Sequence, residues 1–278
     1  LPVLADADDA LAPGAPQIHA DIPGNLCFDY EYGDEAKTNE AFARAAHVTR
    51  ITLDSQRIAG NPMEPKACVA AWDAKTDKYD LYTSSQGMSL MTAGLSGVTG
   101  IPAEKFSVRA QDVGGGFGIR SDAYAEYLAA ILATKTLGRP VKWVSSRSEN
   151  FLSDYHGRAA KLMGELALDR DGNFLGIRIV WIVNAGAYLS TPGPLINTLP
   201  PSLHAINLYR IPAVDGRHRL AMTNTTPATA YRGAGRPNVS YLAERLVEEA
   251  ARETGIDRIE LRRRNLIPKE AFPYKTPI

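Results

Sequence analysis

The chain has 278 residues, of which 31 are Lys or Arg and 31 are Asp or Glu, so its formal net charge at pH 7 is zero. Nucleic acids and anionic membranes recruit proteins with an excess of basic residues, and this balance therefore predicts no nucleic acid partner. The apolar fraction of 45% is enough for a substantial core. No apolar run approaches the roughly 20 residues of a membrane-spanning helix, so we expect no membrane span.

The chain begins at Leu1 with an acidic, proline-rich stretch that lacks the basic start and apolar centre of a signal peptide. We interpret it as a processed chain or as an excised part of a longer one. Cys27 and Cys68 are far apart and belong to no Cys/His pattern, which predicts two buried free thiols rather than a disulfide or a zinc site. Free thiols are typical of a reducing compartment, so we expect the protein in the cytoplasm.

Residues 1–33 are expected to form irregular entry structure. Asp34 can cap a helix that continues to Ala46. Periodicity and turn signals then predict further elements: strands over 48–59, 67–72, 79–84, 141–145, 162–168 and 174–184, and helices over 88–98 and 122–137. The Asp-Gly turn at 169–173 joins the last two strands into a hairpin.

Glycines mark the ends of the predicted helices. Gly100 and Gly138 follow the helices over 88–98 and 122–137. Near the end of the chain, an amphipathic helix is closed by Gly255, and Asp257 with Glu260 resembles the capping box of a final short helix. The apolar residues of the amphipathic helix recur at helical spacing: Val239, Leu242, Leu246 and Ala250.

Strands and helices follow one another without a strict strand–helix–strand rhythm, which favours an α+β fold with mixed sheets and packed helices. In the second arm of the hairpin, alternate residues predict one buried face: Ile177, Ile179, Trp181 and Val183. We expect residues 1–278 to form one functional region with two lobes and a weak boundary near residues 100–110.

Two glycine clusters are the strongest local signals. The first, DVGGGFGIR at 112–120, is not a dinucleotide-binding fingerprint, because Ile119 stands at the third glycine position. It either lets the backbone approach an anion or forms a tight turn between a strand and a helix. The second, AYRGAGRP at 230–237, is either a grip on an anion by two arginines or a solvated loop.

Other catalytic signatures are missing from the sequence. It contains no P-loop and no GxSxG nucleophile motif. The histidines form no metal-binding pair, and we interpret each as structural: His19, His47, His156, His204 and His218.

Four ordered segments give the sequence a resemblance to a known family. They are the two glycine clusters, NPMEP at 61–65 and SSQG at 84–87. Together they resemble the molybdenum hydroxylases, the family of xanthine dehydrogenase, aldehyde oxidase and aerobic carbon monoxide dehydrogenase. The tail ERLVEEAARETGIDRIELRRRNLI is similar to the helical segment that follows in these proteins. The resemblance implies the first part of the molybdopterin-binding region of the large subunit.

The resemblance implies catalytic roles for Gln86, Phe117 and Arg232. Gln86 would hydrogen-bond the apical oxo ligand of molybdenum, and Arg232 would lie beside the equatorial ligands and the dithiolene. The implied cofactor-binding set also contains neighbouring loop residues: Gly115, Gly116, Gly118, Tyr231, Gly233 and Ala234. No side chain would bind the metal directly, because the pterin dithiolene holds it. Preorganised donors of this kind stabilise an oxo-rich centre.

The implied reaction is hydroxylation with water as the oxygen source and hydride transfer to molybdenum. The implied cofactor is molybdopterin with molybdenum, in the cytosine dinucleotide form, and the partner subunits would carry 2Fe-2S and FAD. The family's glutamate base lies toward the C-terminus of the complete subunit, in a motif that does not occur here. Glu64 belongs to the NPMEP segment and is interpreted as a structural carboxylate. We therefore expect half of an active site, inactive alone and completed by polypeptide that carries the base.

Several substrates are disfavoured by the same resemblance. Carbon monoxide oxidisers place a copper-binding cysteine where this chain has Gly233. Xanthine-type enzymes carry a glutamate where Ser121 stands, and the 199–202 stretch offers no substrate-binding cation. An aldehyde or an N-heteroaromatic compound remains. Two rival hypotheses stay open, a non-catalytic cofactor-binding or assembly module of the same fold and an unrelated phosphate-ester binder.

Overall fold

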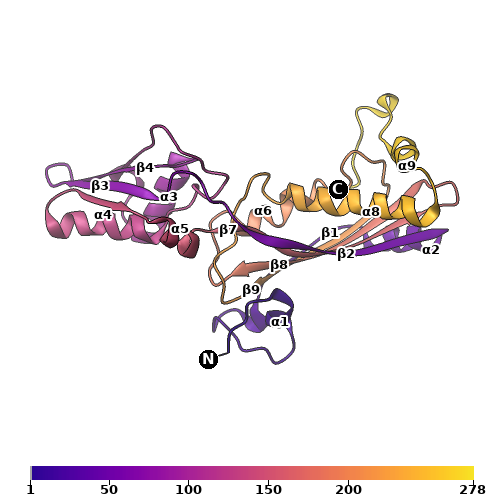
Figure 1. Ribbon diagram of the computed structural model, residues 1–278, viewed down its shortest axis with the longest axis horizontal. Coiled ribbons are helices and arrows are strands. Elements are labelled where there is room, and N and C mark those ends of the chain that lie inside the picture. The colour runs from indigo at the N-terminus through magenta and orange to yellow at the C-terminus, as the bar shows by residue number, and fades with distance from the viewer. Residues whose placement is uncertain (1) are drawn as a thin grey trace. The chain divides into compact units, whose positions relative to one another are not determined.

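The computed structural model describes residues 2–278, and Figure 1 shows its helices and strands. The chain divides into two compact units. Unit 1 comprises the chain up to Arg57 together with 158–228 and 233–278, and unit 2 comprises 58–157 and 229–232. Residues 100–110 lie within unit 2. No helix among residues 2–278 is long and apolar enough to cross a membrane.

Unit 1 is built on a five-stranded mixed sheet in the order β1-β9-β8-β7-β2. Its strands are β1 (Leu26–Gly33), β2 (His47–Ala59), β7 (His156–Leu168), β8 (Phe174–Gly186) and β9 (Val214–Met222). Strands β8 and β9 run parallel, whereas the β1–β9 and β7–β8 pairs are antiparallel. The helices of this unit are α1 (Ala7–Leu11), α2 (Glu35–Ala43), α6 (Gly193–Ile196), α7 (Leu199–Ser202), α8 (Arg236–Thr254) and α9 (Arg258–Asn265).

Helix α8 covers one face of this sheet, as its position along the strands in Figure 1 shows. The predicted alternation on β8 is confirmed, because the four side chains from Ile177 to Val183 are at most 1% exposed. On β7, a Cβ at Gly164 would lie 2.7 Å from Leu246 Cδ1, so the missing side chain lets α8 pack closely. Burial of such apolar side chains contributes about 1.5–3 kcal/mol each.

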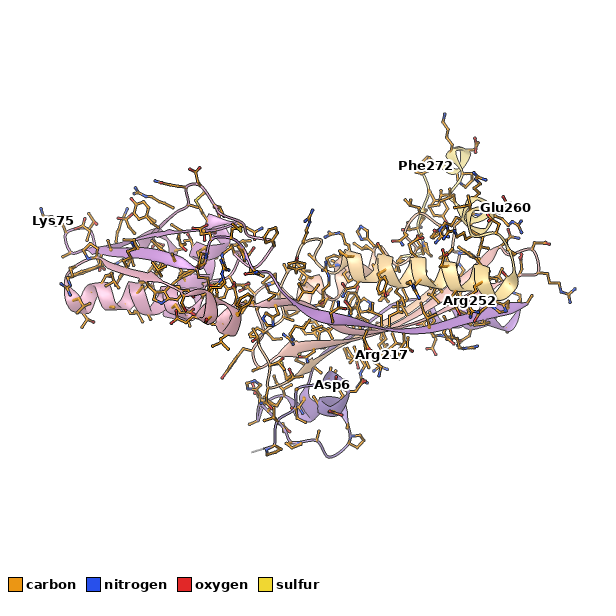
Figure 2. The ribbon with its side chains drawn as sticks, in the orientation of Figure 1. Asp6, Lys75, Arg217, Arg252, Glu260 and Phe272 are labelled. Carbon is orange, nitrogen blue, oxygen red and sulfur yellow. The ribbon has the colours of Figure 1, made fainter. Side chains whose placement is uncertain are left out.

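Helices α1 and α2 lie against the opposite face of the sheet. Ala41 of α2 packs against Gly176. A Cβ built at Gly176 would lie 3.2 Å from the Cβ of Ala41. Charged side chains occupy part of the same sheet, and Arg217, labelled in Figure 2, pairs with Asp29 on the neighbouring strand at 2.5 Å. Its partly exposed position makes this cross-strand pair a small contribution to stability.

Unit 2 contains a four-stranded mixed sheet in the order β5-β4-β3-β6. Its elements are α3 (Met88–Thr99), α4 (Ala125–Leu137), α5 (Arg147–Ser153), β3 (Ala67–Asp73), β4 (Lys78–Thr83), β5 (Phe106–Arg109) and β6 (Val141–Val144). Short 3-10 turns complete the chain: Pro23–Asn25, Ala103–Lys105 and Lys269–Ala271. Leu81, Leu95 and Ile131 belong to the core between this sheet and helices α3 and α4, and each is 0% exposed.

The α+β class with mixed sheets is confirmed, and so are most of the expected elements. Gly100, Gly138 and Gly255 end their helices in the left-handed conformation, as predicted. The expectation that residues 1–33 are irregular is wrong, because β1 pairs with β9 along its length. Helix α4 starts at Ala125 rather than near 122.

Both cysteines are free thiols, and Cys68 is buried whereas Cys27 is only half-buried. Burial raises the pKa of each thiol to about 11, so both are protonated near neutral pH.

Candidate functional site

The first glycine cluster forms an irregular loop in unit 2 between β5 and α4. Gly115, Phe117 and Gly118 have φ angles of 107°, 54° and 104°, which lie in the left-handed region. Residues 119–124 separate the last glycine from α4, so the loop is neither a tight turn nor a direct helix N-terminus. Phe117 is 40% exposed, and its conformation turns the chain so that the neighbouring backbone groups can reach two other segments.

Gln86 precedes α3 and is bound by this loop. Its Oε1 accepts hydrogen bonds from the backbone N–H groups of Gly118 at 2.7 Å and Arg120 at 3.4 Å. Its own N–H donates to the Arg120 carbonyl at 3.1 Å. Because the oxygen must face two N–H donors, the amide nitrogen Nε2 is directed away from them. A Cβ at Gly116 would lie 2.5 Å from Gln86 Cδ, so a side chain there would displace the Gln86 amide from this position.

The second glycine cluster also reaches this loop. The Arg232 N–H donates to the Phe117 carbonyl at 2.8 Å. A Cβ at Gly118 would overlap the carbonyl oxygen of Ala230, which again excludes a side chain. A Cβ at Gly157 would likewise overlap Tyr231. The structure therefore brings Gln86, the Phe117 loop and the 230–232 segment together within unit 2.

Gly233 and Ala234 belong to unit 1, because the unit boundary falls after Arg232. Gly233, Ala234 and Gly235 all have positive φ angles, of 98°, 49° and 84°. Gly235 is the N-cap of α8, and a Cβ there would overlap the Ile196 carbonyl oxygen. The left-handed run thus leads the chain into α8.

Glu64 is tied to the start of the glycine loop by two hydrogen bonds. Its Oε2 accepts from the Gly114 N–H at 2.7 Å, and its own N–H donates to the Gly114 carbonyl at 3.0 Å. Glu64 therefore holds the start of the glycine loop in place through Gly114.

A buried network supports the site, and the sequence analysis missed it. Arg120 and Asp154 form an ion pair at 2.9 Å with side-chain exposures of 0% and 4%. Thr229, just before the Arg232 segment, donates from Oγ1 to Asp122 Oδ2 at 2.9 Å. The position of Arg120 immediately after the glycine cluster was the available signal, but its partner could be found only in the folded chain.

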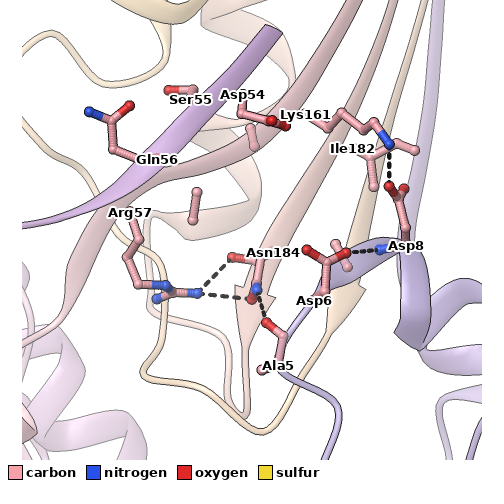
Figure 3. A pocket seen from close by; sticks show the side chains of 13 residues that line it. Ala5, Asp6, Asp8, Asp54, Ser55, Gln56, Arg57, Lys161, Ile182 and Asn184 are labelled. Carbon is pink, nitrogen blue, oxygen red and sulfur yellow. Dashed lines mark hydrogen bonds and ion pairs between the residues drawn. The ribbon is translucent and has the colours of Figure 1, made fainter. Parts of the chain in front are cut away.

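A separate pocket of about 290 Å³ lies in unit 1 (Figure 3). Lys161 pairs with Asp8 in it, and Asp6 accepts a hydrogen bond from the Asp8 N–H. Arg57 donates to Asn184 Oδ1 at 2.9 Å and to the Thr226 carbonyl at 2.6 Å. None of the predicted site residues lines this pocket.

The residues of the Gln86 site fit an oxo-rich, anionic cofactor. Gln86 and Arg232 are exposed, and they supply a neutral amide and a guanidinium, which are hydrogen-bond donors to such a group. The glycines keep side chains out of the loop surface. Among residues 2–278, no group of three His, Cys, Asp or Glu side chains is arranged to hold a metal ion.

Comparisons with known proteins relate the chain to one family. The family model described as "Molybdopterin cofactor-binding domain" matches residues 18–266. The chain is 35% identical to the carbon monoxide dehydrogenase large chain of Hydrogenophaga pseudoflava, covering 99% of this chain and 36% of that protein. It is 32% identical to the 6-hydroxypseudooxynicotine dehydrogenase complex subunit gamma of Paenarthrobacter nicotinovorans, covering 99% and 34%.

The structure of quinoline 2-oxidoreductase from Pseudomonas putida 86 superimposes with a TM-score of 0.91 at 32% identity, covering 99% of this chain and 35% of that one. The chain thus spans about a third of the length of the curated relatives it matches. Sequence motifs, site geometry and family model lead to one conclusion: the chain belongs to the molybdopterin cofactor-binding domain family of the molybdenum hydroxylases.

Proposed function

We propose that this chain forms part of the active site of a molybdenum-dependent hydroxylase that oxidises an aldehyde or an N-heteroaromatic compound. In the overall reaction, a C–H bond and water become a C–OH group, and two electrons and two protons are released. The observation that carries the proposal is the convergence of the Gln86 and Arg232 segments on the glycine loop, through the Gly118–Gln86 and Arg232–Phe117 hydrogen bonds at 2.7 and 2.8 Å.

In this proposal, Gln86, Phe117 and Arg232 are the residues nearest to the reacting centre. When bound, the molybdenum cofactor supplies the two-electron oxidant. Gln86 Nε2 donates a hydrogen bond to the oxo-rich group, and Oε1 remains held by the backbone of the loop. Arg232 counters negative charge on the same group. A donor already oriented before the reaction stabilises developing charge without reorganisation.

The cofactor is held, in the proposal, mainly by backbone groups. Gly115, Gly116 and Gly118 allow close approach because no side chain projects from them. From the second cluster, we propose Tyr231, Gly233 and Ala234 as further cofactor-binding residues. The molybdopterin is proposed to be the cytosine dinucleotide form.

The names of two relatives support an N-heteroaromatic substrate. One relative is named quinoline 2-oxidoreductase, and the other is a subunit of a 6-hydroxypseudooxynicotine dehydrogenase complex. A third relative is a carbon monoxide dehydrogenase. We propose that carbon monoxide is not the substrate of this protein, because Gly233 has no side chain with which to bind copper. The protonated thiols of Cys27 and Cys68 lie outside the 230–237 loop and are poor ligands.

The proposed partners follow from the share of the relatives that the chain covers. Polypeptide corresponding to the remaining two thirds would supply the glutamate base. Relatives described as a large chain and as a complex subunit support further subunits, for which we propose 2Fe-2S and FAD as electron acceptors.

The test is to express the chain in a host that makes molybdopterin, alone and together with polypeptide that supplies the rest of the subunit. We expect the complete assembly to contain about one molybdenum per site and to reduce a dye when an aldehyde or N-heteroaromatic compound is added. The chain alone is expected to be inactive, because the glutamate base is proposed to lie in the remaining polypeptide and Glu64 is engaged by Gly114. Stable assembly without molybdenum would identify an assembly module instead.

A further inference from the structure

The buried ion pair between Arg120 and Asp154 involves the same residue whose backbone binds Gln86. Nη1 of Arg120 donates to both carboxylate oxygens, at 2.9 and 3.1 Å. Removing two charges from water is unfavourable, and an apolar pair of similar volume often stabilises a protein as well or better. The pair is therefore not needed merely to fill the interior of unit 2.

Arg120 connects three parts of the site. Its backbone N–H and carbonyl both bind Gln86, at 3.4 and 3.1 Å. Its Nη2 donates to the carbonyl oxygen of Glu64 at 3.2 Å, and Glu64 in turn binds Gly114. The Arg120 guanidinium, at the end of the glycine loop, thus binds Glu64, which in turn binds Gly114 at the start of the same loop.

Asp154 is held rigidly at the end of α5. Its Oδ1 accepts a hydrogen bond from Tyr124 Oη at 2.7 Å, and its Oδ2 accepts one from Asn150 Nδ2 at 3.2 Å. Helix α5 begins with a complete capping box between Ser146 and Glu149. The carboxylate that receives Arg120 is therefore fixed in position by both of its neighbours.

We propose that Arg120 and Asp154 are positioning residues that hold the Gln86 amide with Oε1 toward the loop and Nε2 directed away from it. The guanidinium anchors the Arg120 side chain, and the anchored residue presents its N–H and carbonyl to Gln86. The significance of this orientation for a bound oxo group rests on the proposed function, but the orientation itself is a property of the protein alone.

Arg147 provides a matched control. Its guanidinium donates to the carbonyls of Pro62 and Met63 at 2.8 Å, so it too anchors the segment that contains Glu64. No hydrogen bond joins Arg147 to Gln86, Gly118 or Arg120 among the bonds of the described residues. Arg147→Lys therefore makes the same chemical change beside the site without touching the Gln86 contact.

The experiment compares backbone amide hydrogen exchange at positions 118 and 120 in the purified protein and three variants. Arg120→Met/Asp154→Leu replaces the pair by apolar side chains, Arg120→Lys keeps the charge but not the fork of donors, and Arg147→Lys is the control. Thermal midpoints are measured in parallel. Loss of one hydrogen bond should speed local opening, and hence exchange, about tenfold.

We expect both Arg120 variants to exchange about tenfold faster or more at positions 118 and 120, and Arg147→Lys to match the unmodified protein. Unchanged exchange in a double variant with the original thermal midpoint would overturn the proposal. If the double variant does not fold, unchanged exchange in Arg120→Lys with the original thermal midpoint would overturn the proposal instead. Molybdenum content is measured separately in the complete assembly, so an absence of molybdenum there would refute the proposed function while leaving the exchange result decisive for positioning.

Discussion

His218 on β9 gives the protein a pH-dependent stability that can be measured without any cofactor. The imidazole is fully buried, and its ring centroid lies 4.8 Å from that of Trp181. Nδ1 is 3.0 Å from the Asn197 carbonyl oxygen, which can only accept, so Nδ1 carries the proton. Nε2 then accepts from Tyr32 Oη at 3.2 Å. Burial lowers the pKa of His218 from 6.5 to about 4.

The sign and the size of the effect follow from this shift. Between about pH 6.5 and pH 4 the unfolded chain binds a proton at His218 that the folded chain excludes. Stability is therefore lost as the pH falls through this window and is complete above it. With 1.36 kcal/mol per pKa unit, the loss attributable to His218 is about 2 kcal/mol at pH 5 and about 3 kcal/mol at pH 4.

The assay is urea unfolding at pH 7, 6 and 5, with His218→Gln as the test and His204→Gln as the control. His204 is exposed and controls for the replacement of a histidine by glutamine outside the core. His218→Gln is expected to be less stable at pH 7 but to lose about 2 kcal/mol less between pH 7 and pH 5. Parallel curves for the original protein and His218→Gln would refute the reasoning.

Two further predictions concern backbone geometry. Gly118→Ala should cost more than about 3 kcal/mol in urea unfolding, because the φ of 104° is strained for alanine and the Cβ meets the Ala230 carbonyl. Gly138→Ala, at φ +61° with open space around it, should cost only about 1–2 kcal/mol, and equal losses would contradict the clash. Oδ1 of Asp257 caps α9 by accepting hydrogen bonds from the N–H groups of Ile259 and Glu260. Asp257→Ala should therefore lower the free energy of unfolding by about 1 kcal/mol, and a loss near zero would show that the cap contributes little.

Elements with local signals were predictable from the sequence. The β7–β8 hairpin has a turn sequence and a period-two pattern, and α8 has helical spacing followed by Gly255. Strand β1 carries only a short signal, the alternation of aromatic and acidic residues from Phe28 to Tyr32, and the sequence analysis missed it. It becomes a strand because β9, far away in the sequence, offers a pairing edge.

The same distinction applies to the site. The glycines and Gln86 could be named from motifs, because close backbone approach requires glycine at specific positions. The contacts that hold them could not, since Asp154 meets Arg120 and Asp122 meets Thr229 only after folding. Neither carboxylate stands in a motif that indicates its partner.

The central claim is that Gln86 presents a donor to an oxo-rich group, and Gln86→Glu tests it most directly. The variant keeps an oxygen for the N–H groups of Gly118 and Arg120 but replaces the donor Nε2 by a second carboxylate oxygen. Gln111→Glu makes the same change at an exposed position nearby and serves as the control. In the complete, molybdenum-loaded assembly, we expect Gln86→Glu to lower kcat about 10²–10³-fold with an unchanged thermal midpoint, and Gln111→Glu to leave kcat unchanged. Full activity in Gln86→Glu would contradict the account.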